Sequence, residues 1–134
     1  MYSARMPRLH SLEPRLHIAD FQRSVAFYRD VLGFEVMATF PEDSPSFALL
    51  SRDGVGIQIG GIDAEKQAAA APTVTLYFDV SDALGLLEEL RGKVTIEWGP
   101  EVFFYHRREF AFRDPDGHLV IVSEETEDPV TARD

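Results

Sequence analysis

Apolar and polar residues alternate over residues 14–19, where the patterned part of the chain begins. Leu16 and Ile18 fall on one side of this stretch. Arg15 and His17 fall on the other side. A period of two is typical of a strand that packs one face and leaves the other open, so we predict a strand here.

A helix and three further strands are predicted to follow. Asp20 can serve as the helix N-cap, apolar residues then recur at spacings of three and four, and Gly33 can end the helix. Apolar alternation predicts strands over residues 34–40, 47–51 and 55–59. Asp53 and Gly54 supply a hairpin turn between the last two. The first half is therefore predicted to be β-α-β-β-β.

The same order returns in the second half of the chain. Residues 73–80 alternate strongly, and Ser81 or Asp82 can cap a helix that ends at Gly92. Further strands are predicted over residues 94–98, 110–113 and 119–123. At an offset of 62 residues, Ile18 matches Val80 and Asp20 matches Asp82. The two halves are therefore interpreted as one repeated unit.

We predict an α+β fold in which two βαβββ modules form a curved, cleft-lining mixed sheet with the helices outside. Residues 1–13 are predicted to be an N-terminal extension and residues 14–125 a single domain. Within this domain the expected parts are module 1 (14–60), a linker (61–72) and module 2 (73–125). Residues 126–134 are expected to form a solvated acidic tail.

Composition narrows the classes of function. The chain has 134 residues, no cysteine and a net charge of −10. It therefore has no disulfide or thiolate site, and its charge disfavours nucleic acid and mildly favours cationic ligands. No segment approaches the about 20 apolar residues of a membrane span, and no signal peptide is evident, so we expect a cytoplasmic protein that binds neither membrane nor nucleic acid.

Polar residues gather on the strand faces that point away from the predicted helices. They are Arg15, His17, Gln58, Thr75, Tyr77 and Asp79. Two interpretations are open: this face lines a ligand cleft, or it is an ordinary solvated sheet face.

Two segments are more specific than these patterns. Residues 20–34 read D-x3-S-x2-F-Y-x3-L-G-F, and residues 109–117 read E-F-x3-D-P-D-G. Together with the paired modules, they resemble the vicinal oxygen chelate superfamily of glyoxalases, extradiol dioxygenases and bleomycin-resistance proteins. The resemblance covers residues 14–125. It implies two βαβββ modules around a cleft and a homodimer.

Metalloenzymes of this superfamily take their ligands from four strands, and the resemblance places those positions in this chain. They are Glu13, Gln58, Thr75 and Ile121. Glu13 is a suitable ligand and Gln58 is acceptable through its amide oxygen, but Thr75 is poor for such ions. Ile121 has no donor atom at all. We therefore expect no cofactor and no catalytic residue.

An alternative set uses a shifted register. His17 shares a strand face with Glu13, and together with Gln58 they could hold one divalent metal ion in a metal-dependent lyase or dioxygenase. In the other interpretation, His17 is a hydrogen-bonding residue that orients a ligand.

Without the metal site, the chain most resembles the bleomycin-resistance branch, over residues 14–28 and again over residues 108–125. That resemblance implies a groove between two subunits for bulky cations, built from aromatic rings and carboxylates. The candidates are Trp98, Phe103, Phe104, Tyr77 and Asp79.

Two residues near the second segment leave alternatives open. His106 stands where the resemblance to this branch implies a glycine. Three interpretations are open: the loop has a different shape, His106 faces the groove, or His106 is a solvated loop residue. Glu109 either binds the ligand or pairs with Arg108.

The leading prediction is a metal-independent binding protein for a small cationic or aromatic molecule, with antibiotic sequestration as one such role. The predicted ligand-binding residues are Arg15, His17, Gln58, Thr75, Tyr77, Asp79, Trp98, Phe103, His106 and Glu109. A third hypothesis is a structural module that has lost its ligand.

Overall fold

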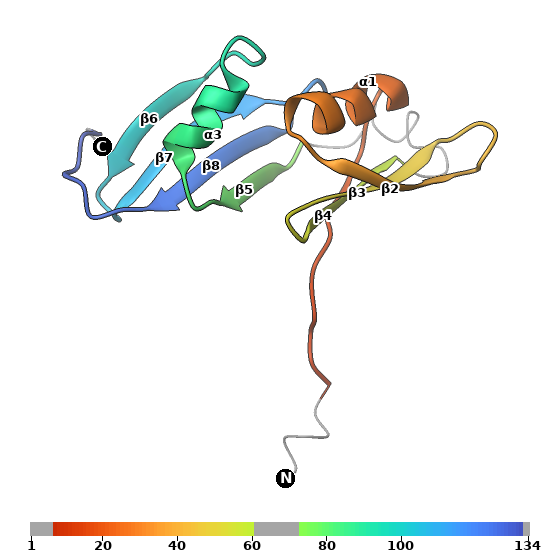
Figure 1. Cartoon of the computed structure of the whole chain (residues 1–134), viewed down its shortest axis with the longest axis horizontal. Coiled ribbons are helices and arrows are strands. Elements are labelled where there is room, and N and C mark those ends of the chain that lie inside the picture. Colours follow the sequence, from red (N-terminus) through yellow and green to blue (C-terminus); the bar gives the residue numbers. More distant parts are fainter. Residues whose placement is uncertain (1–6, 61–72, 133–134) are drawn as a thin grey trace.

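The computed structural model describes residues 7–60 and 73–132 (Figure 1). The predicted linker, 61–72, lies outside the described residues, as do the first six residues and the last two.

The first module forms one four-stranded mixed sheet. Its elements are β1 (Arg15–Leu16), α1 (Phe21–Ala26), the π-helical turn η2 (Phe27–Val31), β2 (Glu35–Phe40), β3 (Phe47–Arg52) and β4 (Val55–Gly60). The strand order is β1-β4-β3-β2, in which only β1 runs parallel to its neighbour.

The second module repeats this plan. Its elements are β5 (Thr75–Asp79), α3 (Ala83–Leu90), β6 (Trp98–Phe103), β7 (Arg107–Arg113) and β8 (Leu119–Glu125). The order β5-β8-β7-β6 has the same connectivity, with β5 parallel to β8. The α+β class and the repeated βαβββ order are confirmed.

The predicted helix starts are confirmed by their caps. The Asp20 carboxylate accepts a hydrogen bond from the Arg23 backbone N–H at 3.0 Å, and the Asp82 carboxylate accepts one from Gly85 at 2.9 Å. Each side chain satisfies a backbone donor that the first helical turn leaves without a partner.

The predicted strand over residues 94–98 is wrong. The strand is β6, which begins at Trp98, where the predicted strand ends, and continues through the Gly99-Pro100 pair. The pairing register shifts between Trp98 and Glu101, so the Gly-Pro pair forms an irregularity inside the strand. A Cβ at Gly99 (φ +87°) would collide with the backbone oxygen of Glu109, so only glycine allows this close approach.

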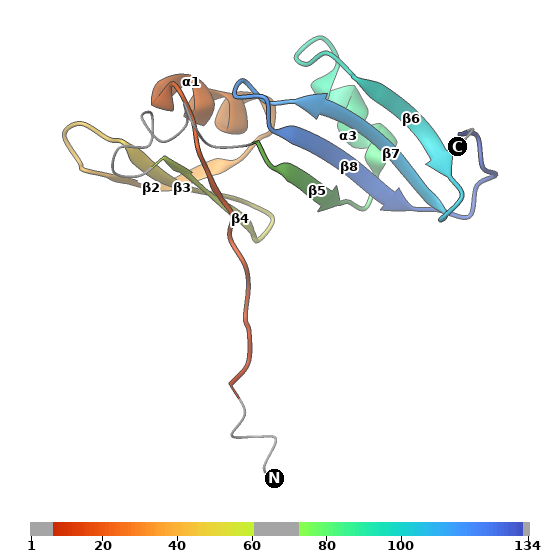
Figure 2. The ribbon, with the colours of Figure 1, turned by 180° about the vertical axis from the view of Figure 1, so that it is seen from behind.

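Both helices lie against one face of their sheets and leave the other face bare (Figures 1 and 2). The buried apolar residues form a single cluster that spans the two modules, with Tyr28, Phe110 and Phe112 among its largest members. We call the uncovered side the bare face. Within the described residues, no helix is long and apolar enough to cross a membrane.

The turn between β7 and β8 joins the two modules. Tyr28, in η2, donates a hydrogen bond to the Asp114 carboxylate at 2.7 Å. The Asp116 carboxylate accepts from the Ala19 backbone N–H at 2.7 Å and from the Ser24 hydroxyl at 3.2 Å. This turn therefore fixes module 2 against the start of α1.

His118 follows the turn glycine Gly117, yet its side chain is buried, with only 2% exposed. Its Nδ1 accepts from the Val74 backbone N–H at 3.0 Å. The other ring nitrogen, Nε2, therefore carries the proton and donates to the His17 carbonyl at 2.8 Å. His118 thus also connects the two modules.

The acidic tail was expected to be solvated, which is only partly correct. Asp128 and Thr131 are exposed, yet Asp128 pairs with Arg108 at 2.6 Å. Thr131 exchanges hydrogen bonds with the backbone of Val102, at 2.8 and 2.9 Å. The tail therefore covers part of the free edge of β6.

Candidate functional site

A buried carboxylate lies in the middle of the second sheet on its bare face. Glu109 of β7 pairs with Ser123 of β8 in the strand register, and Asp79 of β5 pairs with the same serine from the other side. The period of two places these side chains on one face. Glu109 is nevertheless only 2% exposed, because two tyrosines cover it.

Three hydroxyl groups satisfy the Glu109 carboxylate. Tyr105 donates to one oxygen at 2.6 Å, and Ser123 donates to the other at 2.8 Å. The Tyr77 hydroxyl also donates to the second oxygen. A carboxylate removed from water is costly unless such donors replace the lost hydration, and hydrogen bonds to a charged acceptor are the strong ones. The three donors come from separate parts of the module.

The tyrosines remain neutral around this carboxylate. Burial, followed by the hydrogen bond and charge of Glu109, raises the pKa of Tyr105 to about 12. Burial and the Glu109 hydrogen bond also raise the pKa of Tyr77 above its usual value. A phenolate beside a carboxylate would add repulsion, so both hydroxyls stay protonated and act as donors at neutral pH.

Arg107 extends the network along the bare face. Its guanidinium donates to the Ser123 hydroxyl and forms an ion pair with Asp79. The hydrogen bond to Asp79 is the main reason that the pKa of Arg107 is raised. The group therefore contains two carboxylates, one guanidinium and three hydroxyls, all linked through Ser123 or Glu109.

A strip of aromatic rings continues from this group. Trp98 and Phe103 meet edge to face with centroids 5.8 Å apart, and the rings of Phe103 and Tyr105 are stacked at 5.6 Å and 10°. Phe104 then meets Tyr105 at 5.1 Å. We call Trp98, Phe103, Phe104 and Tyr105 the aromatic strip. Phe104 is 75% exposed and Tyr105 is 44% exposed, so the strip offers flat surface to solvent beside Glu109.

The turn between β6 and β7 holds the strip in place. His106 adopts φ +65°, the left-handed region that favours glycine. Its backbone N–H donates to the Phe103 carbonyl at 2.9 Å, and its carbonyl accepts from Thr126 at 3.0 Å. A histidine with an exposed side chain therefore forms a turn conformation that glycine adopts most easily.

The positions expected to hold a metal do not form a donor set. Glu13 and Gln58 lie together, with the Gln58 amide nitrogen 3.3 Å from a Glu13 oxygen. The Gln58 oxygen, the atom that would bind a metal, accepts instead from Arg15 Nε at 3.0 Å. A guanidinium at this point repels a second cation. These residues therefore do not fit a divalent ion.

The alternative set of Glu13, His17 and Gln58 meets the same obstacle at Gln58. Among the residues that the structure describes, no group of three or more His, Cys, Asp or Glu side chains could hold a metal ion. We derive no chemical step through a metal in this chain.

The structure joins five of the predicted ligand-binding residues into one site: Tyr77, Asp79, Trp98, Phe103 and Glu109. Arg15 and Gln58 meet on the first sheet. His17, Thr75 and His106 join neither group through a side-chain hydrogen bond in the described part of the chain. The alternative that Glu109 pairs with Arg108 is wrong, because Arg108 pairs with Asp128.

Sequence reasoning missed Tyr105, Arg107 and Ser123. A signal was available for Arg107, which precedes Glu109 by two residues and so shares its side of the strand. Tyr105 lies in the turn before β7, where strand alternation does not place a side chain. Ser123 could be found only from the register between β7 and β8.

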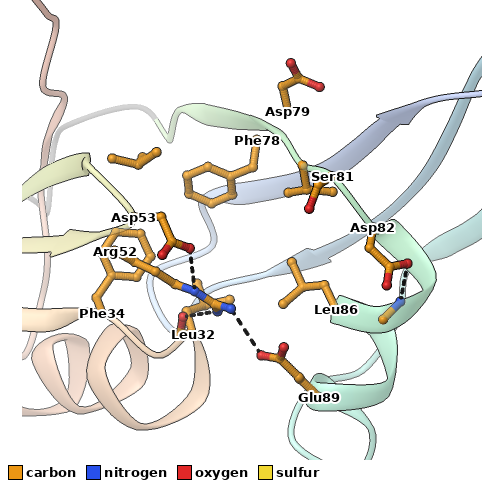
Figure 3. A pocket seen from close by; sticks show the side chains of 13 residues that line it. Leu32, Phe34, Arg52, Asp53, Phe78, Asp79, Ser81, Asp82, Leu86 and Glu89 are labelled. Carbon is orange, nitrogen blue, oxygen red and sulfur yellow. Dashed lines mark hydrogen bonds and ion pairs between the residues drawn. The ribbon is translucent and has the colours of Figure 1, made fainter.

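A hollow of about 540 Å³ lies between the two modules, beside α3, and Asp79 lines its edge as well (Figure 3). Its floor includes Phe34 and Phe78, and Arg52 crosses it to reach Glu89 at 3.3 Å and the Leu32 carbonyl at 2.8 Å. Asp82 caps α3 at its rim. These charged groups already bond to other groups of the protein. The hollow therefore offers a ligand fewer available charged groups than the bare face does.

Comparisons with known proteins point to one superfamily. The family model described as "Glyoxalase/Bleomycin resistance protein/Dioxygenase superfamily" matches residues 8–122. The uncharacterized protein YraH of Bacillus subtilis (strain 168) is 30% identical over 123 residues, which cover 81% of this chain and 93% of that protein.

Two solved structures illustrate the range of this fold. The bleomycin-binding protein from bleomycin-producing Streptomyces verticillus, complexed with copper(II)-bleomycin, has a TM-score of 0.66 and 26% identity, over 92% of this chain and 100% of that one. Lactoylglutathione lyase from Agrobacterium tumefaciens has a TM-score of 0.70 and 18% identity, over 88% and 96%. The second likeness shows the fold alone.

Proposed function

The chain belongs to the Glyoxalase/Bleomycin resistance protein/Dioxygenase superfamily, and we propose that it binds a small organic cation with a planar aromatic part, without using a metal ion. The observation that carries this proposal is the aromatic strip beside the buried Glu109 carboxylate. The ligand is held and released unchanged, so the protein acts by sequestration.

The two halves of the site supply different parts of the binding energy. Flat rings stack on the strip, where aromatic and cation–π contacts contribute about 0.5–2 kcal/mol each. The carboxylate of Glu109 can accept about four hydrogen bonds and receives three. Rotation of the half-exposed Tyr77 opens it to a ligand N–H, and such a charged hydrogen bond contributes about 1.5–3 kcal/mol.

An antibiotic is one class of ligand with this chemistry. The support is the likeness to a structure whose protein binds copper(II)-bleomycin. The net charge of −10 adds long-range attraction for any cation.

We also propose that the protein is a homodimer. Residues 7–13 extend away from the body of the molecule (Figure 1), and within them Leu9 and Leu12 are 100% and 85% exposed. Exposed leucines on an extended arm favour burial against another surface, and a second copy of the chain is our proposal for it.

The single tryptophan of the chain, Trp98, provides a direct test. We propose titrating its fluorescence with benzamidine, a planar cation, and with benzamide, its neutral analogue of nearly the same shape. Bleomycin serves as the large cationic probe. We expect saturable changes with benzamidine and bleomycin and a much weaker response to benzamide.

Matched variants locate the binding. Glu109→Gln removes the carboxylate charge and should weaken benzamidine binding about tenfold, as expected for one charged hydrogen bond. Glu88→Gln makes the same chemical change on α3, where Glu88 pairs with Arg91, and should leave binding unchanged. Equal losses in both variants would show that net charge, not this site, attracts the cation.

Metal content separates the proposal from the enzymatic alternative. The protein is loaded with Ni²⁺, Mn²⁺, Fe²⁺ or Zn²⁺, desalted and examined by mass spectrometry. Stoichiometric retention of one ion would contradict metal independence and favour a lyase or dioxygenase. If none of the aromatic probes binds and no metal is retained, the structural-module hypothesis takes the place of this proposal.

A further inference from the structure

On the bare face of the first sheet, one guanidinium forms no ion pair with any acidic side chain that the structure describes. Arg15 lies on β1 and is exposed, and its Nε donates to the Gln58 amide oxygen at 3.0 Å. Its guanidinium carbon lies 4.9 Å from the centre of the Phe47 ring. These two contacts orient the plane of the guanidinium, and among the described residues neither terminal nitrogen donates a hydrogen bond.

The contrast with other arginines of the described residues is clear. Arg91, Arg107 and Arg113 each form an ion pair with a carboxylate. Arg15 forms none within 4.0 Å in the described part of the chain, although the protein carries a net charge of −10. In so acidic a protein, a structural feature must keep Arg15 from forming an ion pair.

The Gln58 side chain lies between Arg15 and Glu13 and keeps them apart. Its amide oxygen takes the Arg15 Nε–H, while its amide nitrogen donates to Glu13 at 3.3 Å. The Glu13 carboxylate also lies against β4, so that a Cβ at Gly56 would meet its oxygen at 2.9 Å. Within the described residues, the acid is thus held near the guanidinium but forms no ion pair with it.

We propose that Arg15 binds a carboxylate group, with its two terminal nitrogens paired to the two oxygens. A guanidinium fixed in this way matches a planar carboxylate and loses little side-chain entropy when it binds. A carboxylate is favoured over a phosphate because the surrounding negative charge repels a dianion more strongly than a monoanion. The Phe47 ring beneath the guanidinium favours carboxylates that carry a flat apolar group.

This site is separate from the one proposed for cations. It lies on the first sheet, while Glu109 and the aromatic strip belong to the second. Failure of either proposal therefore leaves the other standing, because their probes and variants differ.

The test uses benzoate on the full-length protein at constant ionic strength, followed by NMR. The amide signals of Gly56 and Gln58 and the Arg15 Nε–H signal report on binding. We expect saturable shifts with benzoate and none with benzamide. Arg15→Gln should weaken benzoate binding at least tenfold, the loss expected for a bidentate charged pair.

Control variants make the result specific. Arg91→Gln removes an equal charge just after α3, where Arg91 pairs with Glu88, and should leave benzoate binding unchanged. Gln58→Leu should allow Arg15 and Glu13 to pair and so weaken binding, and adding Glu13→Gln should restore it. Unchanged binding in Arg15→Gln, or an equal loss in Arg91→Gln, overturns the proposal. Tighter binding of inorganic phosphate than of benzoate overturns the assignment to carboxylates.

Discussion

At the scale of single residues, Glu109 determines the properties of its neighbours. It is buried on a sheet face that is otherwise open, and its negative charge is surrounded by hydroxyl donors rather than by a directly bonded cation. Such a carboxylate holds neighbouring phenols in their protonated form. The pKa values of the two tyrosines should therefore depend on the negative charge of Glu109.

This relation gives a prediction for the Tyr105 pKa, which is about 12 in the folded protein. Glu109→Gln removes the negative charge and should lower this pKa, although burial, the larger cause, should keep it above 10. Titration of the Tyr105 ring carbon by ¹³C NMR measures the value, and Tyr105→Phe identifies the signal. A Tyr105 pKa that does not change in Glu109→Gln would contradict the proposed contact.

The same shift affects stability at high pH. The folded-state pKa of Tyr105 lies above the unfolded value of 10.0, so the folded state binds this proton more tightly. Its contribution to stability is complete below pH 10 and is lost as the pH rises towards 12. Glu109→Gln should make this alkaline loss smaller.

The sequence allowed part of this residue-scale picture to be predicted. The period of two placed Tyr77 and Asp79 among the candidates, the second sequence segment added Glu109, and all three lie in one network. The covering of Glu109 by Tyr105 could not be predicted, because the local pattern predicts a strand over residues 94–98 and not the strand that bears Phe103. Strand register depends on contacts between distant segments, which local patterns do not contain.

At the scale of elements, the two specific sequence segments, residues 20–34 and 109–117, contact each other in the fold. Ser24 and Tyr28 belong to the first segment, and Asp114 and Asp116 belong to the second. Tyr28 binds Asp114 at 2.7 Å and Ser24 binds Asp116 at 3.2 Å, across more than 80 residues of chain. The sequence showed that each segment was specific, but the contact between them required the fold.

We expect Asp116→Ala to destabilise the protein by about 2 kcal/mol. The change leaves the buried Ser24 hydroxyl without its acceptor and removes the bond to the Ala19 backbone N–H. Urea unfolding measures the loss. Asp43→Ala, an equal change in the exposed loop after β2, should have little effect. Equal stability of the two variants would show that the turn does not hold the modules together.

At the scale of the whole molecule, the net charge of −10 acts on every ligand before contact. The proposed cation site lies in a region where Asp79 and Glu109 outnumber Arg107, while the proposed carboxylate site presents a lone Arg15 within the same negative field. Long-range attraction and repulsion are screened over about 8 Å at physiological ionic strength. The two sites should therefore respond to salt in opposite directions.

This contrast gives a prediction for association kinetics. When NaCl rises from about 0.02 to 0.5 M, the association rate constant of benzamidine should fall, because salt screens the attraction of the acidic protein for a cation. The association rate constant of benzoate should rise, because the same salt screens the repulsion between the acidic protein and the benzoate anion. Relaxation kinetics, read from Trp98 fluorescence for benzamidine and from NMR line shapes for benzoate, measure the two rates. A parallel fall for both probes would mean that local charges, rather than the net charge of the molecule, control the approach of each ligand.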